Sequence, residues 1–174
     1  SRMIRAAFVA AVAVLAVVVL VGRGPAPAEA VPLSVTVTSP ADSGPGSFRA
    51  AVQQANSNSA ISTINLKNLL PVTLLTSVVY TGTQALTIQG DLPYVYRTIQ
   101  GSLFVPGNPD IEPLDCGMFR STGGADVTFS QVTIQHSWCD ALNIAPAPGD
   151  DEILITLNKV ILRDNFGSGL FLHE

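Results

Sequence analysis

Residues 127–144, VTFSQVTIQHSWCDALNI, and residues 155–172, ITLNKVILRDNFGSGLFL, are two copies of one pattern, and this pattern decides the fold that the sequence predicts. The copies align without a gap at an offset of 28 residues. Six places are apolar in both copies, as three pairs that each bracket one residue, usually Thr or Asn. These places are Val127, Phe129, Val132, Ile134, Leu142 and Ile144 in the first copy, and Ile155, Leu157, Val160, Leu162, Leu170 and Leu172 in the second.

Apolar residues at alternate positions face one side of a β-strand. Three such short strands per unit, repeated at a fixed interval, are typical of one coil of a β-solenoid. We therefore expect an all-β fold, a right-handed parallel β-helix, in which 127–129 pairs with 155–157 and 132–134 with 160–162. An antiparallel β-sandwich is the alternative; the fixed offset and the lack of Asn-Gly or Asp-Gly hairpin turns count against it.

The first 30 residues have the pattern of a secretory signal peptide. Arg2 and Arg5 precede the apolar run 6–21, and Ala28-Glu29-Ala30 matches the small–x–small cleavage pattern. An uncleaved membrane anchor is the alternative, although the run is short of the about 20 residues that a span needs. We expect an exported protein, secreted or on the cell surface, of bacterial origin.

The charge of the chain bears on its partners. Removal of residues 1–30 would leave 6 basic and 12 acidic residues, a formal charge of −6 in place of −4. No basic patch is then available for nucleic acid or for anionic lipid, so we expect neither partner, and a membrane contact only through an uncleaved signal segment. The expected ligand is a polysaccharide or another cell-surface molecule.

A short amphipathic helix is predicted at residues 47–56, after the turn-rich segment 39–46. The Ser47 hydroxyl can cap this helix, because it can accept a hydrogen bond from an otherwise unpaired backbone N–H. The open first rung of a solenoid is where an apolar stripe can be buried, since solenoids need end caps. The stripe consists of Phe48, Ala51, Val52 and Ala55.

Residues 38–56, TSPADSGPGSFRAAVQQAN, resemble the CSLREA-type N-terminal cap segment of secreted right-handed parallel β-helix proteins. Phe48 and Val52 stand where Leu and Ile are usual, and the Cys that begins the segment in some members is missing. Segments 64–66, 71–74 and 85–90 resemble the first rungs of that family, in the same order. The resemblance implies a pectin-lyase-like β-helix without implying pectin-lyase activity. The matching cap residues are Asp42, Gly44, Gly46, Ser47, Arg49, Ala51, Ala55 and Asn56.

Residues 91–124 are less regular. Several prolines interrupt them, and proline is poorly placed in a central strand. We therefore predict that much of this region is a long excursion from the coil, which returns at Met118-Phe119. Such a loop either carries a binding surface or is an irregular packed connection. The prolines are Pro93, Pro106, Pro109 and Pro113.

Cys116 and Cys139 are the two cysteines of the chain. In an exported protein they are candidates for a disulfide. Two buried free thiols fit the sequence equally well, because the sequence does not establish the geometry. His136 lies near Cys139, but there is neither a CxxC motif nor a second histidine nearby, so we expect no metal and no cofactor.

His136 and Asp164 are the candidate catalytic residues. They align in the 28-residue register, so neighbouring rungs would stack them about 4.8 Å apart, as a general base and its orienting carboxylate. An ordinary polar ladder is the alternative, and Ser137 above Asn165 would continue it. The acidic run 150–152 offers carboxylates to a sugar or a metal, but such runs are mostly solvated surface.

No complete catalytic motif is present, whether a Gly-rich phosphate loop, GxSxG or metal-spaced histidines. We expect a non-catalytic structural or adhesive module that presents a glycan- or surface-binding face. The alternative is the N-terminal fragment of a polysaccharide lyase or glycoside hydrolase with its catalytic rungs downstream. The expected organisation is a signal peptide at 1–30, a cap strand and helix at 31–60, and β-helix rungs at 61–174, incomplete because no C-terminal cap follows.

Overall fold

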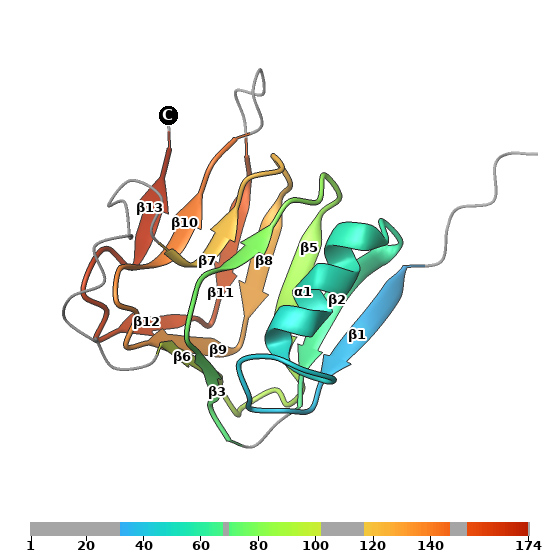
Figure 1. Ribbon diagram of the computed structural model, residues 1–174. Coiled ribbons are helices and arrows are strands. Elements are labelled where there is room, and N and C mark those ends of the chain that lie inside the picture. The colour runs from blue at the N-terminus through green and yellow to red at the C-terminus, as the bar shows by residue number, and fades with distance from the viewer. Residues whose placement is uncertain (1–31, 68–69, 102–116, 147–152, 174) are drawn as a thin grey trace, which may run out of the picture.

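The computed structural model describes residues 32–67, 70–101, 117–146 and 153–173. In these ranges short strands form three parallel sheets, with one helix, α1 (Phe48–Ser57), beside them (Figure 1). Sheet A is ordered β1 (Leu33–Val37), β2 (Ile61–Leu66), β5 (Leu86–Gly90), β8 (Val127–Ser130) and β11 (Ile155–Asn158). Sheet B is ordered β3 (Val72–Leu74), β6 (Arg97–Gly101), β9 (Val132–Gln135) and β12 (Ile161–Arg163). Sheet C is ordered β4 (Val78–Tyr80), β7 (Gly117–Ser121), β10 (Asp140–Ile144) and β13 (Leu170–Leu172).

The chain visits sheets A, B and C in turn, and each visit to all three makes one rung. Rung 1 is β2, β3 and β4, rung 2 is β5, β6 and β7, rung 3 is β8, β9 and β10, and rung 4 is β11, β12 and β13. Every pairing between these strands is parallel, and β1 adds a further parallel strand beside β2. This arrangement is that of a parallel β-solenoid.

The 28-residue repeat is confirmed as the pairing of rung 3 with rung 4. Val127 lies beside Ile155 in sheet A, and the register continues without a slip to the ends of both strands. In sheet B, Ile134 lies beside Leu162. In sheet C, β10 pairs with β13 in the same register. Val160 precedes β12, so the pairing in sheet B begins one residue later than predicted.

Ten of the twelve apolar side chains of the repeat are buried in the core or pack against it, as predicted. All six in rung 3 are buried. In rung 4, Leu157 and Leu172 are exposed, and the other four are partly buried against the core. The interior of the solenoid also holds a row of aromatic rings, Phe48, Phe119 and Phe129, whose successive centroids are 6.3 and 5.3 Å apart. The core therefore runs from the cap through rung 3.

Helix α1 covers the first rung, as the sequence predicts. The Ser47 hydroxyl accepts a hydrogen bond from Ala50 N–H at 3.2 Å, which begins the helix. The predicted stripe of four apolar residues is buried, and α1 contacts β1, β2 and β4. Figure 1 shows the helix packed against the strands at the N-terminal end of the stack. The stripe thus replaces the rung that would otherwise lie above rung 1.

A cluster centred on Arg49 fixes the cap to rung 1. Its guanidinium donates hydrogen bonds to Asp42 Oδ1 at 2.6 Å, to Ser77 O at 2.7 Å and to Thr76 O at 2.8 Å. The same carboxylate oxygen of Asp42 accepts a hydrogen bond from Leu75 N–H at 2.9 Å. The cluster joins the loop before α1, the helix itself and the turn between β3 and β4, so these three segments hold one another in place.

Two sharp corners recur in rungs 3 and 4. Gln131 and Lys159, which lead from sheet A to sheet B, have φ of 57° and 54°. His136 and Asp164, which follow sheet B, have φ of 55° and 53°. These left-handed conformations are uncommon for residues other than glycine. Because the left-handed residues occur at equivalent corners of rungs 3 and 4, we infer that these corners need this backbone conformation to lead the chain from one sheet to the next.

The expectation of a long excursion over residues 91–124 is wrong for residues 97–101. These form β6, a regular strand between β3 and β9. Pro93 does not interrupt β6, because it lies in the turn before the strand. The return to the coil at Met118-Phe119 is confirmed, since both residues belong to β7. The other three prolines of the region lie outside the described residues.

The predicted signal peptide also lies outside the described residues. Within the ranges given above, no helix has the length and apolar character needed to cross a membrane.

Replacement of Phe48 by Ala should lower the free energy of unfolding by about 3–5 kcal/mol, because it removes a fully buried ring that caps the core. Urea denaturation followed by circular dichroism measures this change. Gln54→Ala, on the exposed side of the same helix, is the matched control and should change stability by less than about 0.5 kcal/mol. Equal stability of the Phe48 variant and the unchanged protein would contradict the role of α1 as a cap.

Candidate functional site

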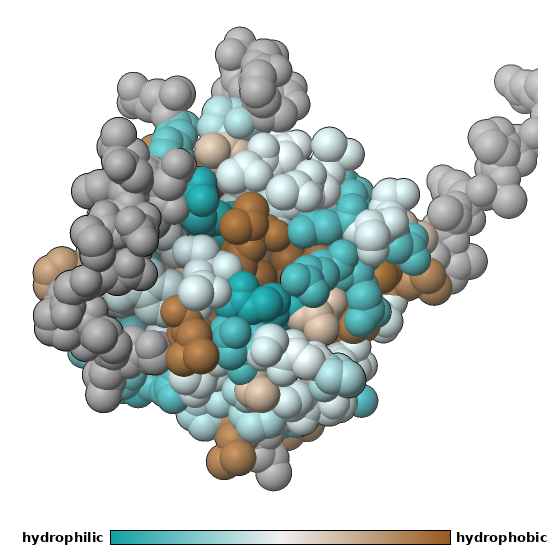
Figure 2. Space-filling model, viewed as in Figure 1, coloured by the Kyte–Doolittle hydropathy of each residue, from teal (hydrophilic) through white to brown (hydrophobic). Residues whose placement is uncertain are grey.

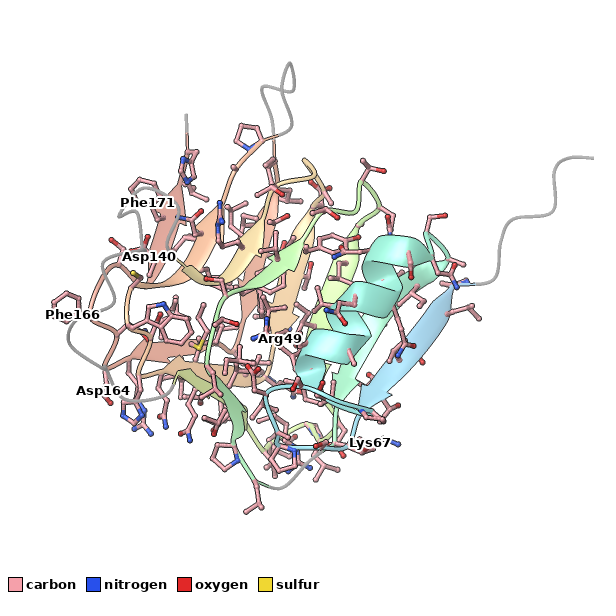
Figure 3. The ribbon with its side chains drawn as sticks, viewed as in Figure 1. Arg49, Lys67, Asp140, Asp164, Phe166 and Phe171 are labelled. Atoms are coloured by element: carbon pink, nitrogen blue, oxygen red, sulfur yellow. The ribbon has the colours of Figure 1, made fainter. Side chains whose placement is uncertain are left out.

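The predicted catalytic residues, His136 and Asp164, occupy the same corner in successive rungs. No hydrogen bond or ion pair joins them in the described part of the chain. The Asp164 carboxylate is 63% exposed and lies 3.8 Å from Nε of its neighbour Arg163. Asp164 and Phe166 lie at an outer corner of the solenoid, far from Arg49 (Figure 3). A catalytic role for His136 and Asp164 stays a prediction.

The residues after this corner form the polar ladder that the sequence offered as the alternative. Asn165 Oδ1 accepts a hydrogen bond from Ser137 N–H at 3.0 Å, which links the two rungs. The backbone continues the link, because Phe166 N–H donates to Ser137 O at 2.9 Å. These contacts hold the two rungs together, so the alignment of the two corners does not require a catalytic role.

The remaining candidates from the sequence fall partly outside the described residues. Cys139 is disulfide-bonded, whereas Cys116 is not among the described residues, so their pairing stays a prediction. The acidic run 150–152 also lies outside them. Within the described ranges, no group of three or more His, Cys, Asp or Glu side chains is arranged to hold a metal ion.

A groove of 310 Å³ lies between α1 and β4, and Figure 2 shows the apolar surface there. Its apolar lining is Val52, Val78 and Val79. The polar groups at its rim are already bonded within the protein: the Asn56 amide donates to Val79 O and accepts from Thr81 N–H. Arg49 is likewise engaged by the cap cluster. The groove therefore lies where the cap meets the solenoid, and the hydrogen bonds of Asn56 and Arg49 hold these two parts together. These groups are not available to a ligand.

The outer face of sheet A presents two continuous columns of uncharged polar residues. They alternate along each strand with the apolar residues of the core, so they point outward. The first, the hydroxyl column, is Ser34, Thr63, Thr87, Thr128 and Thr156. The second, the mixed column, is Thr36, Asn65, Gln89, Ser130 and Asn158. We call the two columns together the sheet A grid.

The grid is accessible and regular. All ten of its residues are partly or fully exposed. Neighbouring residues within a column are about 4.8 Å apart, and the columns are separated by two residues along the strand, about 6.6 Å. In the mixed column Gln89 donates to Asn65 Oδ1 at 2.9 Å. Among the described residues, none hydrogen-bonds to the side chains of the hydroxyl column.

The outer faces of sheets B and C differ from that of sheet A. In sheet B a ladder of side-chain hydrogen bonds joins all four strands, at distances of 3.2, 3.3 and 2.9 Å. Its members, from β3 to β12, are Thr73, Gln100, Gln135 and Arg163. In sheet C the outward Asn143 is only 1% exposed. In the mixed column of sheet A, Asn158 donates to Ser130 Oγ at 3.4 Å, as Gln89 does to Asn65. The hydroxyl column is therefore the row of regular outward polar groups that, among the described residues, has no side-chain partner and can meet a ligand.

The grid could be found in the sequence only in part. The triplets TFS and TLN lie inside the 28-residue repeat, where Thr was already visible between the apolar residues. The earlier triplets TIN and TIQ and the first, SVT, follow the same polar–apolar–polar order, and they are the signal that could have extended the grid to five strands.

Comparison with known proteins assigns no family to the chain, because no protein-family model, curated protein or solved structure matches it. The resemblance of residues 38–56 to a known cap segment therefore stays a prediction.

Two groups with shifted pKa values, Asp42 and Tyr80, lie away from the grid and have structural roles. Burial disfavours the charged form of Asp42, but the hydrogen bonds from Arg49 and Leu75 and the positive charge of Arg49 outweigh it, so the pKa is lowered. Burial raises the pKa of Tyr80 to about 12. The Tyr80 hydroxyl donates to Gln84 O at 2.6 Å inside the rung.

The Asp42 carboxylate should make the stability of the protein depend on pH at the acid end. Because its folded-state pKa is lowered, it stabilises the fold above its unfolded value of about 3.9, and this contribution is lost as the pH falls through the folded value. Asp42→Asn should therefore destabilise the protein at pH 6 and lose this effect progressively below about pH 3.9. Urea titrations from acid to neutral pH measure the difference.

The control for this pH series is Asp164→Asn, because that carboxylate is exposed. A constant stability difference between the unchanged protein and the Asp42 variant over the whole pH range would show that the carboxylate charge does not hold the cap.

Proposed function

We propose that this chain is a non-catalytic module of an exported bacterial protein, secreted or on the cell surface, and that the sheet A grid binds a neutral polysaccharide. The observation that carries the proposal is the composition of the grid: ten outward positions on five strands hold only Ser, Thr, Asn and Gln. Each of these side chains has a hydrogen-bond acceptor and at least one donor, which suits the hydroxyl groups of a sugar chain.

The charge of the protein favours a neutral polymer over an acidic one. The formal net charge is −4, so a polyanion is repelled at long range unless a basic cleft compensates. The grid contains no basic residue that could do so. A neutral polymer meets no such barrier, and it gains affinity by forming several modest hydrogen bonds along a regular surface.

The fold also supports a more specific proposal about the class of β-helix. A parallel β-helix with a helical cap at its N-terminal end is what the resemblance of residues 38–56 implies, and we propose that the chain is pectin-lyase-like and right-handed. Crossover connections between parallel strands are right-handed in nearly all proteins.

Arginine at two grid positions should weaken binding. Thr63→Arg with Thr128→Arg puts bulk and charge on alternate strands of the hydroxyl column. Loss of two hydrogen bonds of about 1 kcal/mol each predicts roughly 30-fold weaker binding. Affinity electrophoresis in gels that contain hydroxyethylcellulose or glucomannan measures it, with polygalacturonate as the acidic comparison.

Gln53→Arg with Gln54→Arg is the matched control, because it adds the same charge on exposed positions of α1 that do not belong to the sheet A grid. Equal retardation of the unchanged protein and the grid variant in the neutral polymers, or retardation by polygalacturonate alone, would contradict the proposal.

The protein should release no reducing ends from either the neutral polymers or polygalacturonate, because in the described part of the chain no hydrogen bond or ion pair joins His136 and Asp164 and the grid holds no carboxylate. A reducing-sugar assay across pH values, with and without calcium, measures this. Depolymerisation that His136→Ala and Asp164→Ala both abolish would assign those residues to an active site.

A further inference from the structure

The turn between β5 and β6, residues 91–96, exposes aromatic rings at one corner of the solenoid. Tyr94 is 88% exposed, and Tyr96 is 41% exposed. Leu92 and Val95 in the same turn are also exposed. Contiguous exposed apolar groups of this kind mark interaction surfaces more often than isolated ones do.

This turn is held in a defined shape despite its exposure. Val95 N–H donates to Leu92 O at 3.4 Å, which closes the turn. At its base the Arg97 guanidinium, with a side chain only 6% exposed, pairs with Asp91 at 2.6 Å. Gln131 of rung 3 donates to Pro93 O at 2.6 Å. A binding group that is fixed before the ligand arrives loses less entropy on binding.

The same contacts place Tyr94 beside the sheet A grid. Gln131 directly follows Ser130 of the mixed column, and it forms the corner of rung 3. Lys159 follows Asn158 in the same way in rung 4, and its Nζ lies 6.0 Å from the centroid of the Tyr94 ring. The turn from rung 2 thus runs down this corner past rungs 3 and 4, next to the edge of the grid.

We propose that Tyr94 is an aromatic stacking platform for one pyranose residue of the neutral polysaccharide that the grid binds; the inference rests on the proposed function above. The C–H face of a pyranose ring is apolar, so it packs against the flat face of an aromatic ring, while its hydroxyl groups stay free to hydrogen-bond. Lys159 Nζ lies over the Tyr94 ring, and because Tyr94 is 88% exposed, the ring keeps enough open surface for a sugar to stack on it.

The test compares two substitutions at Tyr94 in the same affinity gels of hydroxyethylcellulose and glucomannan. Tyr94→Ala should bind about tenfold more weakly, because it removes the stacking contact. Tyr94→Phe keeps the ring and should bind as the unchanged protein does. Val95→Ala, an exposed apolar change in the same turn, is the control and should leave binding unchanged. Since Tyr94 is almost fully exposed, both Tyr94 variants should melt at the same temperature as the unchanged protein.

The outcomes separate this inference from the proposed function. Normal binding by Tyr94→Ala, together with loss of binding by Thr63→Arg with Thr128→Arg, overturns the stacking platform and leaves the grid proposal in place. Equal losses for Tyr94→Ala and Tyr94→Phe also overturn the platform, because the hydroxyl group and not the ring face would then carry the contact. Failure of the unchanged protein to bind either neutral polymer overturns both proposals.

Discussion

The structure depends on parallel backbone pairing in sheet A, which places each residue beside its equivalent in the next rung. Ile64, Ile88 and Phe129 are aligned in this way, and so are the residues before them, Thr63, Thr87 and Thr128. Because side chains alternate between the two faces, a slip of one residue would bury the threonines and expose the apolar column. A single register thus produces both the core and the polar outer face. The function proposed for sheet A is therefore a consequence of the same constraint that makes the fold.

The apolar core is covered to different extents at the two ends of the stack. At rung 1, α1 supplies a surface that buries Phe48 completely. At rung 4, the equivalent surface is open, and Leu172 is 54% exposed. The outer strands there have backbone N–H and C=O groups with no strand beside them in the described part of the chain. Among the described residues, rung 4 packs against rung 3 alone.

The sequence predicted rungs 3 and 4 from their constant repeat interval, whereas the rung segments 64–66, 71–74 and 85–90, which coincide with β2, β3 and β5, came only from the resemblance to a known family. From Ser130 to Asn158 the interval is 28 residues, and both rungs were found. From Asn65 to Gln89 it is 24, and from Gln89 to Ser130 it is 41, so no single offset aligns all the rungs. Because of this variation in the interval, β6 and most of the grid could not be predicted from the repeat. The pairing of His136 with Asp164 was visible because their interval is regular, but in a parallel solenoid every residue has such an equivalent, and alignment alone does not distinguish chemistry from architecture.

The difference between the outer faces of sheets A and B follows from the length of their side chains. Strands are about 4.8 Å apart, and a hydrogen bond needs donor and acceptor within about 3.2 Å. The amide of Gln135 is long enough to donate to Gln100 and to accept from Arg163 on the other side, so the ladder in sheet B satisfies itself. The hydroxyl column holds only Ser and Thr, with no long amide or guanidinium side chain to bridge its neighbours, and among the described residues no side chain hydrogen-bonds to it, so its hydroxyl groups bond to water or to a ligand. The short side chains of the hydroxyl column are thus what keep that part of sheet A open to a sugar.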